Sequence, residues 1–239
     1  MESLELIPGM RIHSRRCMTM DDTLIIADLH LGYESALAND GMHLPRVQTR
    51  RMVESLANLL DDLEPDRVVV LGDLKHEFSR NLDQEWRDVQ STLSMIQASA
   101  EVVLVRGNHD NYLATITSRM GIPLLDSFQI GDTTLVHGHV NCPSRPVIMG
   151  HEHPSIRLVD SVGAQIKLPC FLHHPEMEIT VLPAFSPLAL GTDMSSVEPG
   201  DFFSPILMGK DMGDAQIFTC SDIGLLQLGK LSALSGLRV

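Results

Sequence analysis

Short polar clusters follow several apolar segments of this chain, and they contain Asp, Asn and His in arrangements that can bind cations. The clusters are Asp28-Leu29-His30, Gly72-Asp73, Gly107-Asn108-His109-Asp110, His137-Gly138-His139 and Gly150-His151-Glu152-His153. Residues i and i+2 on extended backbone point the same way, so each D-x-H or H-x-H pair can hold an ion from one side. Mixed carboxylate, amide and imidazole ligands suit Mn²⁺, Fe²⁺ or Zn²⁺, whereas Ca²⁺ and Mg²⁺ prefer oxygen alone. The clusters therefore predict a centre for two divalent ions.

The clusters are positioned by predicted strands, because each one directly follows an apolar run. These runs are 23–27, 67–71, 101–105, 128–136 and 146–149. Apolar residues at helical spacing predict helices between the first strands and after the third. These helices are 47–64, 83–98 and 112–120. Strands that alternate with helices indicate a parallel sheet, and ligands bind at the carboxyl edge of such a sheet. We therefore expect all five clusters to meet at one edge.

The remaining segments predict additional strands and one irregular region. Residues 4–20 predict one or two strands, and 33–45 are polar and typical of turns. In the second half, strands are expected within 156–170, 178–182 and 215–228. Residues 186–214 are rich in Gly, Pro, Ser and Asp, so we expect a long loop or a small cap there. The 239 residues are expected to form a single domain.

Composition and charge exclude several classes of protein. Hydrophobic residues make up 44% of the chain, which is enough for a real core and excludes wholesale disorder. The sequence has no apolar run long enough to span a membrane and no signal-peptide core, and its four cysteines are scattered. We therefore expect reduced thiols and a cytoplasmic location. The net charge of −13 disfavours binding of nucleic acid by electrostatics alone, unless basic residues cluster or bound cations change the local sign.

The ordered set of clusters resembles the calcineurin-like metallophosphoesterase superfamily. Its pattern is D-x-H, G-D, G-N-H-D, a strand-ending His and G-H-x-H, matched here over roughly residues 22–155. The segment Leu71–Glu77 (LGDLKHE) further resembles small phosphoesterases related to the repair nuclease SbcD. The resemblance implies an α/β (α+β) sandwich in which two mixed β-sheets pack face to face between helices. It also implies a dinuclear metal site at the carboxyl ends of the strands.

The resemblance implies a role for each residue of the clusters. Asp28, His30 and His153 would bind the first ion, Asp73 would bridge both ions, and Asn108, His137 and His151 would bind the second. His109 would lie beside the scissile phosphate as general acid or as a stabiliser of developing charge, oriented by Asp110. Mn²⁺ is the expected metal, with Fe²⁺, Zn²⁺ and Ni²⁺ as alternatives.

The implied activity is hydrolysis of a phosphoester by a hydroxide that bridges the two metals. A phosphodiesterase or nuclease-like enzyme is the first hypothesis. A phosphomonoesterase or nucleotide phosphatase, and a catalytically idle metal-binding scaffold, are the alternatives. The chain has no H-x-H-x-D-H segment of the metallo-β-lactamase type. Nucleotides or nucleic acid are possible substrates, and a homo-oligomer or a repair-protein partner is a further hypothesis.

The roles of four more residues near the clusters are also considered. His76 contacts substrate or a metal-bound water, or else it forms a hydrogen bond within its own loop. Lys75 reaches a phosphate, or it is a solvated surface lysine. Arg106 contacts substrate or, more in keeping with its place before the G-N-H-D turn, bonds the loop backbone. His139 is expected to lie behind the metal ligands, because the first His of H-G-H matches the ligand of the family.

Overall fold

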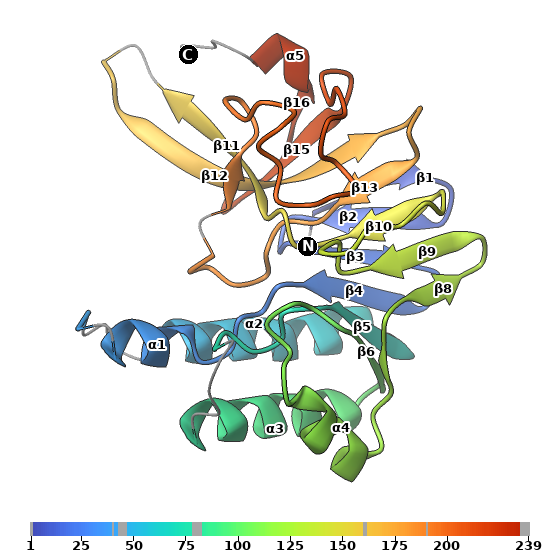
Figure 1. The fold of residues 1–239 in the computed structure, drawn as a ribbon, viewed down its shortest axis with the longest axis vertical. Coiled ribbons are helices and arrows are strands. Elements are labelled where there is room, and N and C mark those ends of the chain that lie inside the picture. Colours follow the sequence, from blue (N-terminus) through green and yellow to red (C-terminus); the bar gives the residue numbers. More distant parts are fainter. Residues whose placement is uncertain are drawn as a thin grey trace.

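The structure is a computed structural model that describes residues 2–39, 41–42, 47–77, 83–159, 162–189 and 191–234. Two mixed β-sheets lie one on the other, as the sequence predicts, and four helices cover the outer face of the first sheet (Figure 1). No helix in these ranges is long and apolar enough to cross a membrane.

Within the described ranges, the first sheet has seven strands that follow one another in chain order. They are β1 (Ser3–Ile7), β2 (Met10–His13), β3 (Cys17–Met20), β4 (Thr23–Ala27), β5 (Arg67–Leu71), β6 (Glu101–Val105) and β7 (Leu124–Leu125). Strands β1 to β4 are antiparallel, and β4 to β7 are parallel. Residues 4–20 were expected to hold one or two strands, but they take part in three because tight turns at 8–9 and 14–16 reverse the chain.

Helices connect the parallel strands. They are α1 (Tyr33–Asn39), α2 (Gln48–Leu63), α3 (Asp83–Gln97) and α4 (Leu113–Met120). The last three were predicted, whereas α1 lies where turns were expected. Helix α1 has no apolar stripe that a periodicity could reveal, because Glu34 and Ser35 are among its buried residues. The Glu34 carboxylate accepts hydrogen bonds from the backbone N–H groups of Gln48 and Thr49, at the start of α2.

The second sheet has nine strands among the described residues. They are β8 (Phe128–Ile130), β9 (Thr133–Val136), β10 (Val147–Met149), β11 (Pro154–Val159), β12 (Gln165–His174), β13 (Ile179–Val181), β14 (Thr192–Asp193), β15 (Gln216–Ser221) and β16 (Gly224–Lys230). The single strand expected over 128–136 is a hairpin, because Gly131 turns the chain at φ +54°. Strand β10 runs parallel to both of its neighbours, β9 and β13.

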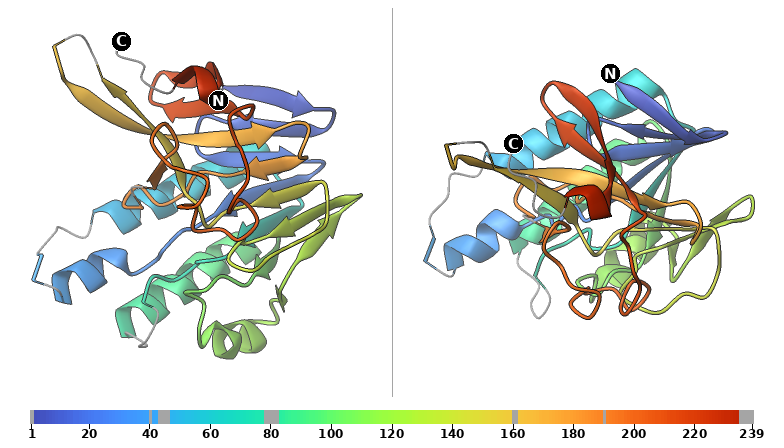
Figure 2. Two further views of the ribbon diagram at one scale, coloured as in Figure 1. Left: turned by 45° about the horizontal axis from the view of Figure 1, so that its top comes forward. Right: turned by 90° about the horizontal axis from the view of Figure 1, so that it is seen from above.

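The two sheets share a core, and each has a second core on its outer face. In β4, Ile25 and Ala27 point into the space between the sheets, while Leu24 and Ile26 point toward the helices. This alternation follows from the two-residue period of a strand. The outer face of the second sheet is covered by α5 (Leu231–Leu234) and by residues 194–212 (Figure 2). Phe202 is one of the buried side chains of this layer. Part of the region expected as loop or cap therefore packs as a layer.

Candidate metal centre

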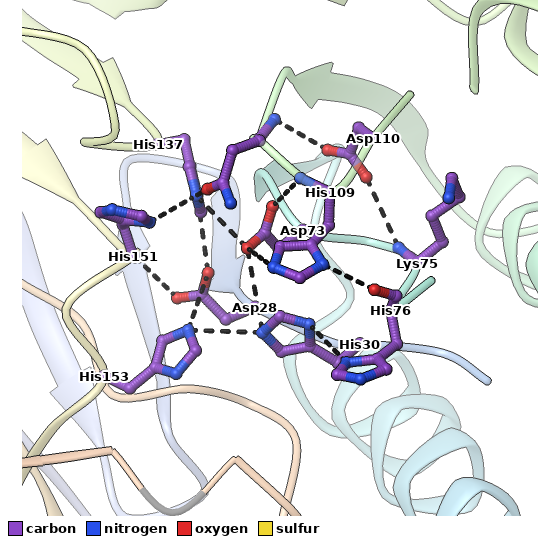
Figure 3. Close-up of polar contacts among 12 residues, drawn as sticks. Asp28, His30, Asp73, Lys75, His76, His109, Asp110, His137, His151 and His153 are labelled. Carbon is purple, nitrogen blue, oxygen red and sulfur yellow. Dashed lines mark hydrogen bonds and ion pairs between the residues drawn. The ribbon is translucent and has the colours of Figure 1, made fainter. Parts of the chain in front are cut away.

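Strand register brings the five polar clusters to one place. Ala27 pairs with Leu71 and Leu71 with Val105, so β4, β5 and β6 end side by side. In the second sheet, Met149 pairs with Val136 in the same way. The residues that follow these five strand ends carry the candidate side chains, and Figure 3 shows them gathered around two carboxylates. The sequence predicted this convergence from the strand-end positions, but at the edge of a single sheet. In the structure three of the clusters follow strands of the first sheet and two follow strands of the second.

Two groups of potential ligands share one carboxylate. The groups are Asp28, His30, Asp73 and His153, and Asp73, His137 and His151, with the ligand atoms of each group within 4.8 Å of one another. Asn108 Oδ1 joins the second group at 3.1 Å from His137 Nε2. All seven residues proposed as ligands are therefore close together. The division between the groups is the one that the resemblance implies, with Asp73 between them.

The unsatisfied atoms of this cluster fit divalent cations. Asp28 is fully buried, and its Oδ1 has no hydrogen-bond donor in the described part of the chain, although His153 Nε2 lies 3.3 Å away. Ring nitrogens also face each other, at 3.4 Å between His30 and His153 and at 3.1 Å between His137 and His151. A buried carboxylate oxygen without a donor is costly unless a positive charge compensates it. The donor set of imidazole, carboxylate and amide suits Mn²⁺, Fe²⁺ or Zn²⁺.

Five of the seven candidate ligands have left-handed backbone conformations. They are Asp28, His30, Asp73, His151 and His153, with φ between +46° and +67°. Such conformations are uncommon for residues other than glycine, and each costs on the order of 1–3 kcal/mol. Their concentration at one edge indicates that the fold accepts strain in order to aim these side chains. Nothing in the sequence signals this strain.

Hydrogen bonds orient the most buried imidazole. His137 Nδ1 lies 2.9 Å from the carbonyl oxygen of Leu71, which can only accept a hydrogen bond. The proton of a neutral His137 therefore resides on Nδ1, and Nε2 presents its lone pair to the cluster, 3.5 Å from Asp73 Oδ2. A backbone contact of this kind is the usual way in which a metal-ligating histidine is held in one tautomer.

The electrostatics of the cluster separate its imidazoles into two kinds. Burial lowers the pKa of His30 to about 3 and that of His151 to about 4, so both are neutral and able to ligate. Burial also acts to lower the pKa of His137, but the adjacent carboxylates of Asp73 and Asp28 raise it to about 9. Burial alone raises the pKa of each of these carboxyl groups, yet the surrounding imidazoles hold both below the usual value.

His109 and Asp110 have different partners from those expected. His109 lies beside the cluster, where its Nε2 is 4.0 Å from Asp73 Oδ2 and its backbone N–H donates to Asp73 Oδ1. Its Nδ1 is 2.6 Å from the carbonyl oxygen of His76, which therefore orients the ring. The Asp110 carboxylate instead accepts hydrogen bonds from the backbone N–H groups of Gly107 and Leu74. Asp110 thus ties together the loops that carry Asp73 and Asn108.

The four residues with open interpretations lie in distinct surroundings. Lys75 is not a solvated lysine, because it is 1% exposed and its ammonium group pairs with Glu85 at 3.9 Å. The ring of His76 stacks on Tyr33, with centroids 3.7 Å apart, and its Nδ1 is 3.4 Å from His30 Nδ1.

Arg106 and His139 lie on the other side of the cluster. The backbone N–H of Arg106 donates to Leu125, and its guanidinium pairs with Asp126 at 3.5 Å. The ring of His139 is 5.2 Å from that of His137 and 6.2 Å from that of His151, so it adjoins two of the candidate ligands.

A pocket of about 370 Å³ opens over the cluster. Its lining includes His30, His109 and Phe203, whose side chain is 67% exposed. Sequence reasoning missed Phe203, because it lies in the irregular region and matches no motif. Its neighbours fix its direction: Phe202 is buried, and the buried Ser204 donates from its backbone to Glu152 Oε2 at 3.0 Å and from its hydroxyl to Gly138 O at 2.7 Å. An exposed aromatic ring is therefore held at the rim of the pocket.

The sequence profile of the calcineurin-like phosphoesterases matches residues 22–161, which span all five clusters. The chain belongs to this family. It is accordingly a metal-dependent hydrolase of phosphoester bonds. A comparison with curated protein sequences gives no match. The more specific resemblance to SbcD-related phosphoesterases stays a prediction.

Solved structures share the fold. A nuclease, MPE from Pseudomonas putida, superposes with a TM-score of 0.69 at 19% identity, over 95% of this chain and 99% of that one. The phosphoesterase YfcE from E. coli aligns over 89% of this chain and 94% of that chain, at 15% identity and a TM-score of 0.40. The first comparison shows that the whole two-sheet architecture, and not only the segment with the motifs, occurs in another protein.

Proposed function

We propose that the enzyme is a phosphodiesterase that cleaves nucleic-acid strands, and that it uses the seven clustered ligands and His109. The observation that carries the proposal is the position of His109. Its side chain is 27% exposed, lines the open pocket and lies 4.0 Å from the carboxylate shared by both ligand groups. It is thus the one proton donor of the His109-Asp110 pair that can reach a substrate, because Asp110 is 1% exposed.

In this proposal the seven ligands hold two divalent ions. Asp28, His30 and His153 would hold one ion, Asn108, His137 and His151 would hold the other, and Asp73 would contribute to both groups. When bound, such ions neutralise the phosphate oxygens and activate a water molecule as nucleophile. Because the ligand imidazoles and carboxylates are buried and oriented by the fold, little reorganisation is needed during the reaction.

His109 supplies the proton for the leaving group. Because its Nδ1 is bonded to the His76 carbonyl, a protonated His109 carries its second proton on Nε2, the nitrogen nearer the shared carboxylate. That proton can be donated to the alkoxide that leaves when the ester bond breaks. Asp110 keeps the two ligand loops together and holds the backbone next to His109 in place.

Two features of the pocket favour a diester over a monoester. Its described lining contains no lysine or arginine that could neutralise the second negative charge of a monoester dianion. The exposed ring of Phe203 at the rim offers a surface on which a base beside the scissile phosphate can stack. The fold shared with a bacterial nuclease supports the same proposal.

The proposal extends to the setting of the enzyme. We propose Mn²⁺ as the native metal, nucleotides or nucleic acid as substrate, and the cytoplasm as the location, since all four cysteines are free thiols. We also propose that residues 1–239 act as one catalytic domain, in which part of 186–214 caps the pocket through Phe203. A homo-oligomer or a repair-protein partner remains a hypothesis.

The test compares a diester with a monoester on one preparation of known metal content. Protein loaded with Mn²⁺ is expected to hydrolyse bis-p-nitrophenyl phosphate faster than p-nitrophenyl phosphate and to cleave a single-stranded oligonucleotide. A preference for the monoester would support the phosphatase alternative instead. Protein that holds two metals but hydrolyses none of these esters would be the idle scaffold, and the proposal would be wrong.

A further inference from the structure

A second pocket, of about 480 Å³, lies outside the metal centre. It is formed where four separate segments meet: the turn between β2 and β3, the first turns of α2, residues 185–187, and the turn between β15 and β16. Side chains with hydrogen-bonding groups dominate its lining. They are Ser14, Arg15, Arg16, Gln48, Arg51, Ser55, Ser221 and Asp222.

The charge of this lining contrasts with that of the whole protein. The chain has a net charge of −13, yet the pocket contains three arginines, Arg15, Arg16 and Arg51, against one carboxylate, Asp222. The guanidinium of Arg51 is exposed and has no hydrogen bond or ion pair with any described residue. Guanidinium groups that converge with neutral donors form the usual protein site for a phosphate oxyanion.

The other two arginines are partly engaged in the fold. Arg15 pairs with Asp62 on α2, an exposed contact of the kind that contributes little energy and can be shared with a ligand. Arg16 is more enclosed, and its guanidinium donates to the carbonyl oxygen of Ser186 at 3.3 Å. It therefore forms a fixed wall of the pocket, whereas Arg51 is available at the mouth.

The pocket adjoins the metal centre. Met18 pairs with Ile25, so the turn that carries Arg15 and Arg16 lies at the edge of the sheet where β4 ends and Asp28 follows. The backbone N–H of Ser186 donates to the carbonyl oxygen of Asp28 at 3.2 Å, next to the Arg16 contact. Arg16 also lines a cavity of about 90 Å³ that includes His153. One arginine thus borders both the pocket and the surroundings of a candidate ligand.

We propose that the pocket lined by Arg15, Arg16 and Arg51 binds a second phosphate of the substrate strand, other than the phosphate that is cleaved. The proposal rests on the phosphodiesterase function above and adds the direction in which the strand leaves the metal centre. A polyanion that reaches this pocket gains contacts that a substrate with one phosphate cannot make. The pocket therefore selects nucleic-acid strands over small diesters, in a protein whose overall charge repels them.

The test uses two neighbouring arginines on α2. Arg51→Gln removes a guanidinium from the pocket, whereas Arg50→Gln makes the same change of charge on an arginine that pairs with Glu54 and does not line this pocket. Binding of a labelled single-stranded oligothymidylate is measured by fluorescence anisotropy on chelator-treated protein, so that no cleavage occurs. We expect Arg51→Gln to weaken binding by about five-fold at low salt and to reduce the salt slope by about 0.7, the value for one lost phosphate contact on a single strand. Arg50→Gln should change neither quantity by as much.

A variant with the opposite expected sign guards against a trivial loss of folding. Asp222→Asn removes the carboxylate from the lining, so binding of the oligothymidylate should become tighter. The position of the bound phosphate is then tested with a methylphosphonate at single internal linkages and with removal of the terminal phosphate. Loss of the Arg51 effect with one neutral internal linkage identifies a backbone phosphate as the ligand, and loss with the terminal change identifies an end group.

Kinetics separate this proposal from the one on which it rests. With Mn²⁺ present, Arg51→Gln should raise KM for the oligonucleotide and leave hydrolysis of bis-p-nitrophenyl phosphate unchanged. Equal effects of Arg51→Gln and Arg50→Gln on binding, or no effect of either, would overturn the phosphate pocket even if the enzyme is a phosphodiesterase. Failure of the wild type to hydrolyse any diester would instead refute the proposed function, while the anisotropy experiment would still report on the pocket.

Discussion

At the scale of single residues, the candidate metal centre contains two kinds of side chain, and substitution of each kind should have a different effect. Asp73 belongs to both ligand groups, so in the proposed function it would contact both ions. His109 contacts this carboxylate only through its backbone and at 4.0 Å through its ring, and it belongs to neither of the two groups that contain Asp73. The proposed roles, metal binding for Asp73 and proton donation for His109, therefore predict different effects of substitution.

The first prediction concerns these two residues. Asp73→Asn should lower the metal content of the purified protein, because both ligand groups lose their shared anion, and activity should fall with it. His109→Ala should keep the metals and lose about 10²- to 10⁴-fold in turnover of a diester, the usual contribution of a general acid. Metal analysis and kinetics on the same samples check both outcomes. Normal metal content in Asp73→Asn would contradict the assigned bridge.

A second prediction follows from the raised pKa of His137. In the metal-free protein this pKa is about 9, so His137 is protonated at pH 7. A metal can bind only to the neutral ring, and binding must therefore release about one proton from this residue. Affinity for Mn²⁺ should rise with pH and level off above pH 9. Calorimetry in two buffers of different ionisation enthalpy measures the protons released, and identical heats in both buffers would contradict the prediction.

At the scale of elements, the loops that follow the strands depend on glycine for two different reasons. Gly72, Gly107 and Gly150 lie in the loops that carry the candidate ligands. Gly72 is required for a turn, because its φ is +74°. The other two are required for close approach, because a Cβ on Gly107 would lie 2.2 Å from Asp73 Oδ1 and one on Gly150 would lie 2.6 Å from Asp28 Oδ2.

The third prediction uses this close approach. Gly150→Ala should displace the Asp28 carboxylate and weaken metal binding by about ten-fold or more, which corresponds to about 1.4 kcal/mol. Gly200→Ala is the matched control, because Gly200 has no atom within 4 Å of an added Cβ and no positive φ. Titration with Mn²⁺ of both variants checks the result. Equal affinities would show that Asp28 can move without loss of its ligand role.

Motif spacing and periodicity could predict the parallel strands β4, β5 and β6, the helices α2 to α4 and the meeting of the clusters, because these depend on local patterns. They could not predict α1, whose buried face is polar, or the partner of His109, which is a backbone carbonyl 33 residues away in the chain. Phe203 and the arginine pocket depend on segments that meet only in the folded protein. Contacts of this kind leave no periodic signal.

At the scale of the whole molecule, buried histidines couple stability to pH. Burial lowers the pKa of His13 and His76 to about 4, and that of His30 and His151 also falls. In the unfolded chain these histidines have pKa values near 6.5, well above their pKa values in the folded protein. Folding stability is therefore lost as the pH falls from about 6.5 toward 4. His137, with its raised pKa, acts in the opposite sense between pH 6.5 and 9.

The fourth prediction is that metal-free protein unfolds more readily at pH 5 than at pH 7. Among the described residues, six histidines have a pKa that burial lowers, and all six act in this direction, while burial raises the pKa of Asp110 to about 6, which opposes it. We expect a lower urea midpoint at pH 5 with an unchanged m-value. His13 lies in β2, outside the ligand groups, so His13→Gln should reduce the pH dependence without altering metal content. A midpoint that does not change with pH would contradict this reading of the buried rings.

Four of the candidate ligands follow strands of the first sheet, and three follow strands of the second. Each cation would therefore have ligands from both sheets of the sandwich and would link the two sheets. Removal of the ions should weaken the packing between the two sheets rather than unfold a single loop. Amides in β4, β5 and β10 would then exchange with deuterium together, at a common rate set by how often the two sheets separate.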